Sequence, residues 1–150
     1  MIQGGMQWVA NAELAAAVSN SGGLRIILAL SQPTPDALRK EIRKCCSLTS
    51  RPFGVNLAIL PAVHPPDYLA YTNVIVDEGV QIVGTAGSNP ASIIPSLEHS
   101  NVTILHKCTS IRHAKSALAW IFLSIDGFEC AGHHKFDPLE PCQARACSSD

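Results

Sequence analysis

Side chains able to do proton or metal chemistry cluster at residues 126–134, "DGFECAGHH", directly after an apolar run. An imidazole with an unperturbed pKa of about 6.5 accepts a proton near neutral pH. His133 is therefore a candidate general base, and a polar loop histidine is the plain alternative. Zinc also takes thiols and imidazoles, but the spacing of Cys130, His133 and His134 matches no standard zinc pattern. We therefore expect no metal site.

A second group of small and polar residues lies at the ends of other apolar runs. Gly5, Met6 and Gln7 follow the first run, Asn56 lies inside "FGVNLAIL", and Lys107 ends "VTILHK". Glycine lets the backbone come close to a ligand, and a lysine can face an electron-rich or anionic group. Gathered on one rim, these residues suit a flat polar cofactor. Turn glycines, a core amide and a solvated lysine remain the structural alternatives.

The elements that must position these residues are short apolar runs that alternate with helical stretches. Runs rich in Ile, Val and Leu, with little polar alternation, are typical of parallel strands that are buried on both faces. The predicted strands are residues 1–5, 24–30, 53–60, 80–85, 102–107 and 121–126. The predicted helices are residues 11–23, 34–46, 65–79, 89–100 and 109–120.

Repeated strand–helix units predict an α/β fold with a parallel sheet and right-handed crossovers. Such a sheet is either open and doubly wound or closed into a (β/α)8 barrel. Composition alone does not choose between the two. In both, ligands bind at the carboxyl ends of the strands, so we expect the residues described above to share one site.

Local signals refine the limits of the helices. Asn11 is a plausible N-cap of the first helix, and Thr34 followed by Pro35 is typical of the start of the second. Pro95 lacks an amide hydrogen, which predicts a short or kinked fourth helix. The basic run "RKEIRK" (39–44) is interpreted as a solvated helix face.

Composition narrows the classes of function. A chain of 150 residues suits one domain, and its 47% hydrophobic and 15% charged residues fit buried strands. A formal charge of -1 gives no reason to expect a nucleic-acid surface. No apolar run is long enough for a membrane span, and the first residues lack the pattern of an export signal. The six cysteines are therefore expected to be free thiols in a reducing cytoplasm.

Five segments, spread in order over residues 2–133, together resemble one family. They are "IQGGMQWVANAELAAAVSNSGGL", "RPFGVNLAILP", "TAGSNP", "ILHKCTSIRHA" and "SIDGFECAGH". In order and spacing they are similar to the nitronate monooxygenases, formerly called 2-nitropropane dioxygenases, which are FMN-dependent TIM-barrel enzymes. The resemblance implies an incomplete (β/α)8 TIM barrel of about six parallel strands with alternating helices.

The resemblance also implies a role for each candidate residue. His133 would be the catalytic base, and Lys107 would contact the flavin ring system. The other flavin-binding residues implied are Gly5, Met6, Gln7, Asn56, Asp126, Ala131 and Gly132. The implied reaction is oxidation of an alkyl nitronate by FMN and oxygen, giving a carbonyl compound and nitrite. The base is needed when a neutral nitroalkane must first lose its α-proton.

The chain departs from the family pattern in three places, one of which is a shortened connection between the fifth helix and the sixth strand. Arg25 stands where the family usually has glycine, and its long side chain is expected to point outward or to crowd the rim. Residues 134–150 do not resemble the family and are expected to form an irregular tail, which leaves residues 1–133 as a partial flavin-binding barrel. A barrel truncated after six strands has two open sheet edges, through which another copy could pair.

Two alternatives to nitronate oxidation stay open. In the first, the chain is a non-catalytic remnant; retention of flavin separates this reading from an enzyme. In the second, it is another FMN barrel, an NAD(P)H-dependent enoyl or quinone reductase. Nitrite release from a nitronate, as against consumption of NAD(P)H, separates these two reactions.

Overall fold

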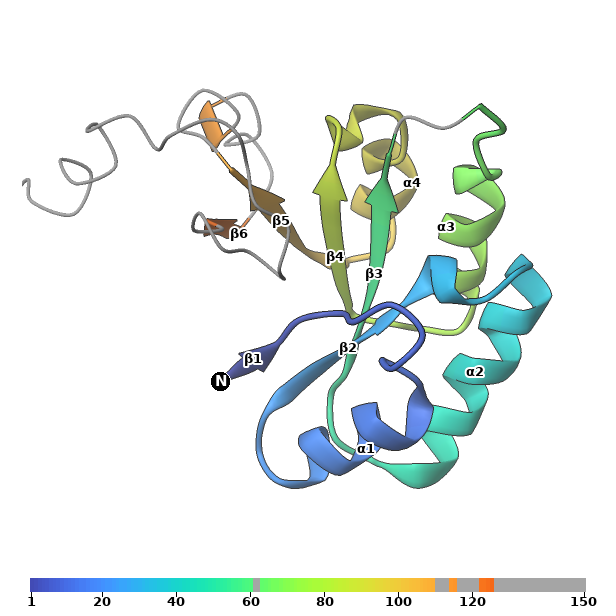
Figure 1. The fold of residues 1–150 in the computed structure, drawn as a ribbon, viewed down its shortest axis with the longest axis vertical. Helices are drawn as coiled ribbons and strands as arrows, with labels where there is room; N and C mark the ends of the chain where they lie inside the picture. Colours follow the sequence, from blue (N-terminus) through green and yellow to red (C-terminus); the bar gives the residue numbers. More distant parts are fainter. Residues whose placement is uncertain (61–62, 110–113, 116–121, 126–150) are drawn as a thin grey trace, which may run out of the picture.

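A computed structural model describes residues 1–60, 63–109, 114–115 and 122–125. Within them, six strands form one parallel sheet in the order β1-β2-β3-β4-β5-β6 (Figure 1). The strands are β1 (Ile2–Gln3), β2 (Leu24–Leu28), β3 (Gly54–Ile59), β4 (Ile82–Gly87), β5 (Thr103–Cys108) and β6 (Phe122–Ile125). All six predicted strands are present, each with limits within two residues of those observed.

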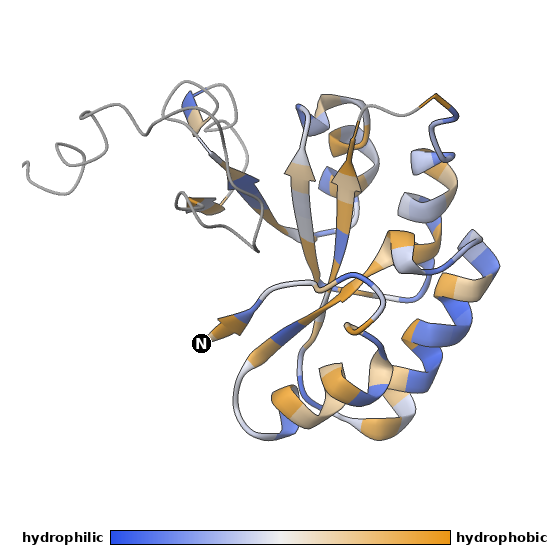
Figure 2. Cartoon of the chain, in the orientation of Figure 1, coloured by the Kyte–Doolittle hydropathy of each residue, from blue (hydrophilic) through white to orange (hydrophobic). Residues whose placement is uncertain are grey.

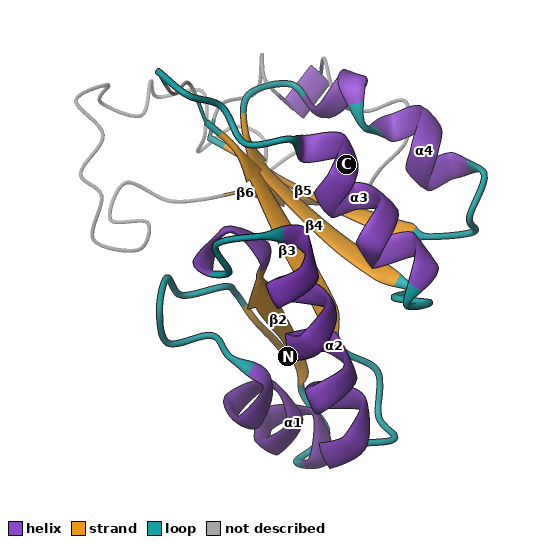
Figure 3. Cartoon of the chain, turned by 90° about the vertical axis from the view of Figure 1, so that its right-hand side faces the viewer, coloured by secondary structure: helices purple, strands orange, loops and turns teal. Residues whose placement is uncertain are grey.

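The helices follow the strands and cover one face of the sheet (Figures 1 and 3). They are α1 (Ala12–Asn20), α2 (Pro35–Leu48), α3 (Tyr68–Asp77) and α4 (Ile94–Glu98), with 3-10 turns η1 (Ala29–Ser31) and η2 (Pro90–Ser92). In the described part of the chain, no helix has the length and apolar character that crossing a membrane would require. The fifth predicted helix falls almost entirely outside the described residues.

The strand order decides between the two α/β architectures. Each strand pairs with the next one along the chain, and the order does not reverse. A doubly wound sheet reverses its order at a switch point and carries helices on both faces, whereas a (β/α)8 barrel is wound in one direction. The sheet curls away from the helices, with β1 and β6 at its two ends (Figure 1). The predicted incomplete barrel is confirmed.

The hydrophobic core lies between the sheet and the helices. Because side chains alternate across a strand, Val55 and Leu57 of β3 both face the helices. There they pack with residues such as Leu38 and Ile42 of α2 and Ile75 of α3, all fully buried. Figure 2 shows the apolar residues concentrated in the strands and along the inner sides of the helices. This packing joins the sheet to the helices that cover it.

The helix starts agree with the local signals, with one difference. The Thr34 hydroxyl accepts a hydrogen bond from the Ala37 amide at 3.1 Å, and Pro35 occupies the first helical position of α2. Asn11 precedes α1, but its side chain caps no amide and instead donates to the Trp8 carbonyl. Pro95 lies in α4, a helix of five residues. Proline has no amide hydrogen to donate within a helix, so a short helix is the predicted result.

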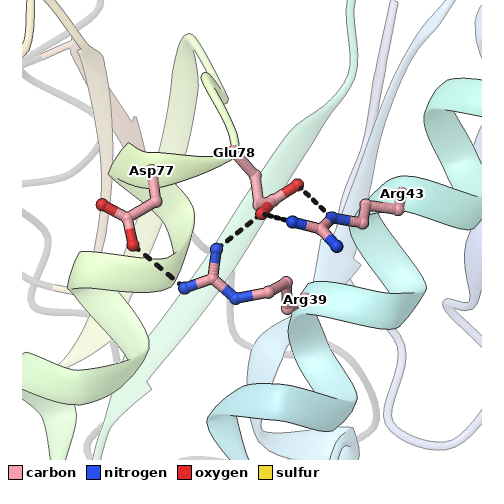
Figure 4. A network of polar contacts seen from close by, with 4 residues as sticks. All are labelled: Arg39, Arg43, Asp77 and Glu78. Atoms are coloured by element: carbon pink, nitrogen blue, oxygen red, sulfur yellow. Dashed lines mark hydrogen bonds and ion pairs between the residues drawn. The ribbon is translucent and has the colours of Figure 1, made fainter.

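The sequence predicted that the basic face of α2 is solvated. In the structure, part of this face also forms ion pairs with the end of α3. Arg39 bonds Asp77 at 2.9 Å and Glu78 at 2.6 Å, and Arg43 bonds Glu78 at 2.8 Å (Figure 4). The hydrogen bond from Arg43, the largest contribution, and that from Arg39 lower the pKa of the Glu78 carboxyl. The network ties the end of α3 to α2, a contact that depends on tertiary structure and leaves no local pattern.

Arg25 neither reaches solvent nor lines the rim. It lies in β2 on the same face as Ile27 and is fully buried, with Nη1 donating to the Gly4 carbonyl at 2.7 Å. Its Nε and Nη2 atoms have no hydrogen-bond partner among the described residues. Burial lowers the pKa of the guanidinium, which is the expected result of desolvating a charge. Of the two predicted positions, the rim is therefore wrong; Arg25 points outward from the barrel, on the helix-facing side, but is buried there.

Candidate functional site

A cavity of about 360 Å³ lies on the face of the sheet that turns away from the helices. Its size is near the lower end of the range typical of small-molecule sites. Residues from every strand contribute to the wall. Among them are Gly4 and Gly5 after β1, Asn56 on β3, Gly84 and Thr85 on β4, and Lys107 on β5.

Strand register brings these residues together. Asn56 pairs with Leu28 on one side and with Gly84 on the other, and Gly84 pairs with Leu105. Because strand residues two apart share a face, Lys107 lies on the cavity face beside Leu105. The parallel barrel therefore gathers side chains that are about 50 residues apart in sequence onto one wall.

Glycines keep the wall open. A Cβ atom on residue 84 would lie 3.0 Å from the Asn56 Oδ1, and one on residue 5 would lie 3.3 Å from the Leu28 Cδ1. A Cβ on residue 4 would meet nothing within 4 Å. Bare backbone at these positions allows a flat group to approach the sheet closely, as a flavin ring would need.

Two polar groups in the wall suit a flavin ring. Asn56 is half-buried, and its amide makes no hydrogen bond with another residue in the described part of the chain. A half-buried amide without a partner is uncommon unless a ligand or water satisfies it. Lys107 is the one charged residue among the described residues of the wall. An amide and a cation on a glycine-lined surface fit the polar edge of a flat, electron-rich cofactor.

Behind this wall, β4 and β5 are joined by a buried hydrogen bond. The Thr85 hydroxyl and His106 Nδ1 lie 2.8 Å apart, and both residues are fully buried. They are register partners, one residue before the Ala86–Lys107 pair. The bond therefore fixes the position of β5 directly beside Lys107.

The loop after β1 is held in a conformation that is unusual for its residues. Trp8 has a φ of 64°, a left-handed value that a bulky side chain rarely adopts. Its amide donates to the Ser31 hydroxyl at 3.0 Å, which anchors the loop to the turn after β2. The Trp8 side chain is exposed, and the strained loop lies at the carboxyl end of β1.

The structure brings together three of the predicted site residues. Gly5, Asn56 and Lys107 line the cavity, whereas Met6 and Gln7 are exposed and are not among its lining residues. The Met6 carbonyl instead accepts the amides that close the following turn. The predicted positions Asp126, Ala131, Gly132 and His133 lie outside the described residues.

Sequence reasoning missed other residues of the wall. Gly84, Thr85, Leu105 and Ser124 also line the cavity. Alternation reveals Gly84, Leu105 and Ser124 only once Asn56 is known to face the cavity and the strand register is known. Thr85, one residue further along β4, has the opposite orientation, so alternation does not reveal it.

A one-directional parallel barrel with a polar, glycine-lined cavity on its inner face is typical of (β/α)8-barrel enzymes that bind a cofactor. A family model described as nitronate monooxygenase matches residues 1–140. The chain belongs to the nitronate monooxygenase family, whose members are flavin-dependent oxidoreductases.

Curated relatives match most of this chain but only part of their own length. A (3aS,4S,5R,7aS)-5-hydroxy-7a-methyl-1-oxo-octahydro-1H-indene-4-carboxyl-CoA dehydrogenase of Mycobacterium tuberculosis is 32% identical over 89% of this chain and 37% of its own. A probable nitronate monooxygenase of Staphylococcus haemolyticus is 47% identical over 49% of this chain and 18% of its own. This chain thus spans 37% or less of these relatives.

Solved structures agree with the fold. FabK from Thermotoga maritima has a TM-score of 0.69 and is 32% identical, covering 78% of this chain and 36% of its own. A nitroalkane oxidase from Streptomyces ansochromogenes has a TM-score of 0.74, covering 85% of this chain and 46% of its own. Its identity of 24% supports the shared fold alone.

Proposed function

We propose that this chain supplies the flavin-binding part of an enzyme that oxidises alkyl nitronates. FMN and oxygen convert the nitronate to a carbonyl compound and nitrite. The observation that carries this proposal is the meeting of Gly5, Asn56 and Lys107 on one open cavity wall in a chain of this family. Bound FMN would supply the redox chemistry that protein side chains lack.

The residues of the wall would hold the cofactor by complementary contacts. The bare backbone at Gly5 would let the flavin ring lie close to the sheet. The Asn56 amide can both donate to and accept from the polar ring edge, and the Lys107 cation would favour negative charge on the ring. Met6 and Gln7, on the adjoining loop, would reach the cofactor from its outer side.

The family resemblance extends the proposal to residues beyond the described part. His133 would take the α-proton from the carbon of a neutral nitroalkane, leaving the electron pair on the nitronate. Asp126, Ala131 and Gly132 would lie beside the flavin. Residues 1–133 would then form the flavin-binding domain and residues 134–150 a separate tail.

Partners and location follow from the same proposal. The substrates would be a small nitronate or nitroalkane and oxygen, in the cytoplasm, with no nucleic acid and no membrane. Among the described strands, β1 and β6 lie at the two edges of the sheet, and these edges could pair with another copy of the chain, because edge strands leave backbone amides and carbonyls without a strand partner.

A second candidate is an FMN-dependent NAD(P)H reductase of enoyl or quinone substrates. The observation that favours it is the 32% identity with FabK over 78% of this chain. Cofactor binding would be common to both candidates, whereas the electron donor would differ.

The test begins with the visible spectrum of the purified chain after it has been loaded with FMN and freed of excess. A retained flavin band, followed by nitrite release from an alkyl nitronate, supports nitronate oxidation. NAD(P)H consumption without nitrite release supports the reductase. The His133→Ala variant should lose turnover of neutral nitroalkanes while it keeps turnover of preformed nitronates. A colourless protein contradicts flavin binding by this chain.

A further inference from the structure

The Asn56 side chain lies across the neighbouring strand at Gly84. The two residues are register partners on β3 and β4. A Cβ atom on residue 84 would lie 3.0 Å from the Asn56 Oδ1 and 3.4 Å from the Asn56 Cβ. A carbon–oxygen separation of 3.0 Å is too short for a relaxed contact, so an added methyl group would force the carboxamide to move.

On its other side, Asn56 is bounded by Leu28 and Gly5. Leu28 is the register partner of Asn56 on β2. A Cβ on residue 5 would lie 3.7 Å from the Asn56 Cβ and 3.6 Å from the Leu28 Cβ, which places all three residues close together. The Asn56 carboxamide thus has the Leu28 side chain beside it on β2, and on β4 it lies against Gly84, which has no side chain.

Among the described residues, the orientation of the Asn56 amide is set by van der Waals contacts and not by a hydrogen bond. Among the described residues, the Asn56 side chain has no hydrogen-bond partner, although it is half-buried. Its orientation therefore depends on the atoms that it touches. At position 84 the missing side chain leaves the space that the carboxamide oxygen occupies.

Strand β4 lies between Asn56 and Lys107, the two polar groups of the cavity, and carries only small residues there. On the cavity face, β4 presents Gly84 opposite Asn56 and Ala86 opposite Lys107. Neither residue has a side chain large enough to separate the amide from the cation. A flat ligand can therefore contact both groups while it lies against β4.

We infer that Gly84 is a positioning residue that holds the Asn56 carboxamide in the orientation that a flat, heteroaromatic ligand meets. This inference deepens the proposed function and rests on it for the identity of the ligand. The carboxamide offers one donor and one acceptor side, which complement a ring edge carrying alternating N–H and carbonyl groups, such as that of a flavin.

The first arm of the test needs no ligand. In the 150-residue chain the Asn56 side-chain amide gives one pair of signals in a proton–nitrogen correlation spectrum, identified by its loss in Asn56→Ala. Gly84→Ala should shift this pair, because the added methyl group displaces the carboxamide. Gly4→Ala adds the same methyl group to the same wall, where it meets nothing, and should leave the pair in place. An unshifted pair in Gly84→Ala overturns the inference.

The second arm measures FMN affinity by quenching of flavin fluorescence. Gly84→Ala should weaken binding about tenfold when Asn56 is present and no more than about twofold in an Asn56→Ala background. Equal effects in both backgrounds overturn the inference. If the unmodified chain binds no FMN, the proposed function fails, and the amide signals alone decide whether Gly84 positions Asn56.

The double variant also covers the case in which Gly84→Ala does not fold. Asn56→Ala removes the group that the methyl would strike, so the double variant should give the spectrum of a folded chain, matching that of Asn56→Ala alone. A double variant that also fails to fold shows that Gly84 serves another contact, which contradicts its assignment as the residue that positions Asn56.

Discussion

Thr85 and His106 form a fully buried hydrogen bond, 2.8 Å long, between neighbouring strands directly beneath the candidate site. Their register places this bond one residue before Lys107. The polar wall of the cavity is thus backed by a polar contact inside the helix-facing layer. Buried hydrogen bonds of this kind are expensive to break, since the remaining partner stays away from water.

Thr85→Val should lower the free energy of unfolding by about 1–3 kcal/mol, because valine keeps the shape but leaves His106 Nδ1 without this partner. Denaturant unfolding measures the change. Thr103→Val, at an exposed position on β5, is the matched control and should change stability by less than about 0.5 kcal/mol. Equal stability of the two variants would show that the buried bond contributes nothing net.

Gly87→Ala should be among the most damaging single changes at a glycine. Gly87 has a φ of +87°, and a Cβ there would lie 2.2 Å from the Ile59 carbonyl oxygen. Gly79→Ala is the control, because its φ of +71° carries the same backbone strain with nothing within 4 Å. We expect a loss of about 1–2 kcal/mol at Gly79 and about 1–3 kcal/mol more at Gly87, measured by denaturant unfolding. Similar losses at both sites would rule out the clash.

Arg25→Met should raise stability, by about 1–4 kcal/mol, because two of the three guanidinium nitrogens are buried without a partner among the described residues. Methionine has a similar volume and needs no hydrogen bonds. Arg51→Met, at an exposed position, is the control and should be nearly neutral. A less stable Arg25→Met protein would indicate that the contact with the Gly4 carbonyl outweighs the buried charge.

Glu78→Gln should lower the melting temperature at pH 7, and the loss should shrink as the pH falls. The two arginines lower the pKa of the Glu78 carboxyl below its ordinary value of 4.5. A lowered pKa stabilises the fold above the ordinary value, and this contribution disappears as the pH falls through the pKa of the folded state. The parent and variant melting temperatures should therefore converge below pH 4.5. Melting curves across this range test the expectation, with Glu98→Gln, at an exposed position, as a control that should leave the melting temperature at pH 7 nearly unchanged.

The sequence predicts the repeating elements well because their signals are local. Apolar runs mark the strands, and Thr34 with Pro35 marks the start of α2 at the residue observed. Predicting the strand order needed more than these local signals, since the composition fits both an open sheet and a barrel. The family resemblance favoured the barrel, and the sequential order in the structure confirms it.

The candidate site was only partly predictable, because register is a property of the folded sheet. Asn56 and Lys107 stand out as polar residues in apolar strands, but Gly84 has no local signal that links it to Asn56. Arg25 shows the same limit, since its burial depends on how β1 and α1 pack around β2. The pairs Arg39–Asp77 and Arg43–Glu78 likewise join helices that are distant in sequence.

The sequential order of the strands has a consequence for how the chain folds. Each strand pairs with the next one to be synthesised, so the sheet can grow from β1 towards β5 without waiting for a distant segment. Contacts of short sequence separation close small loops and generally form quickly. We expect the units from β2 to β4, with the most extensive core, to form the first stable nucleus, on which later units assemble one at a time.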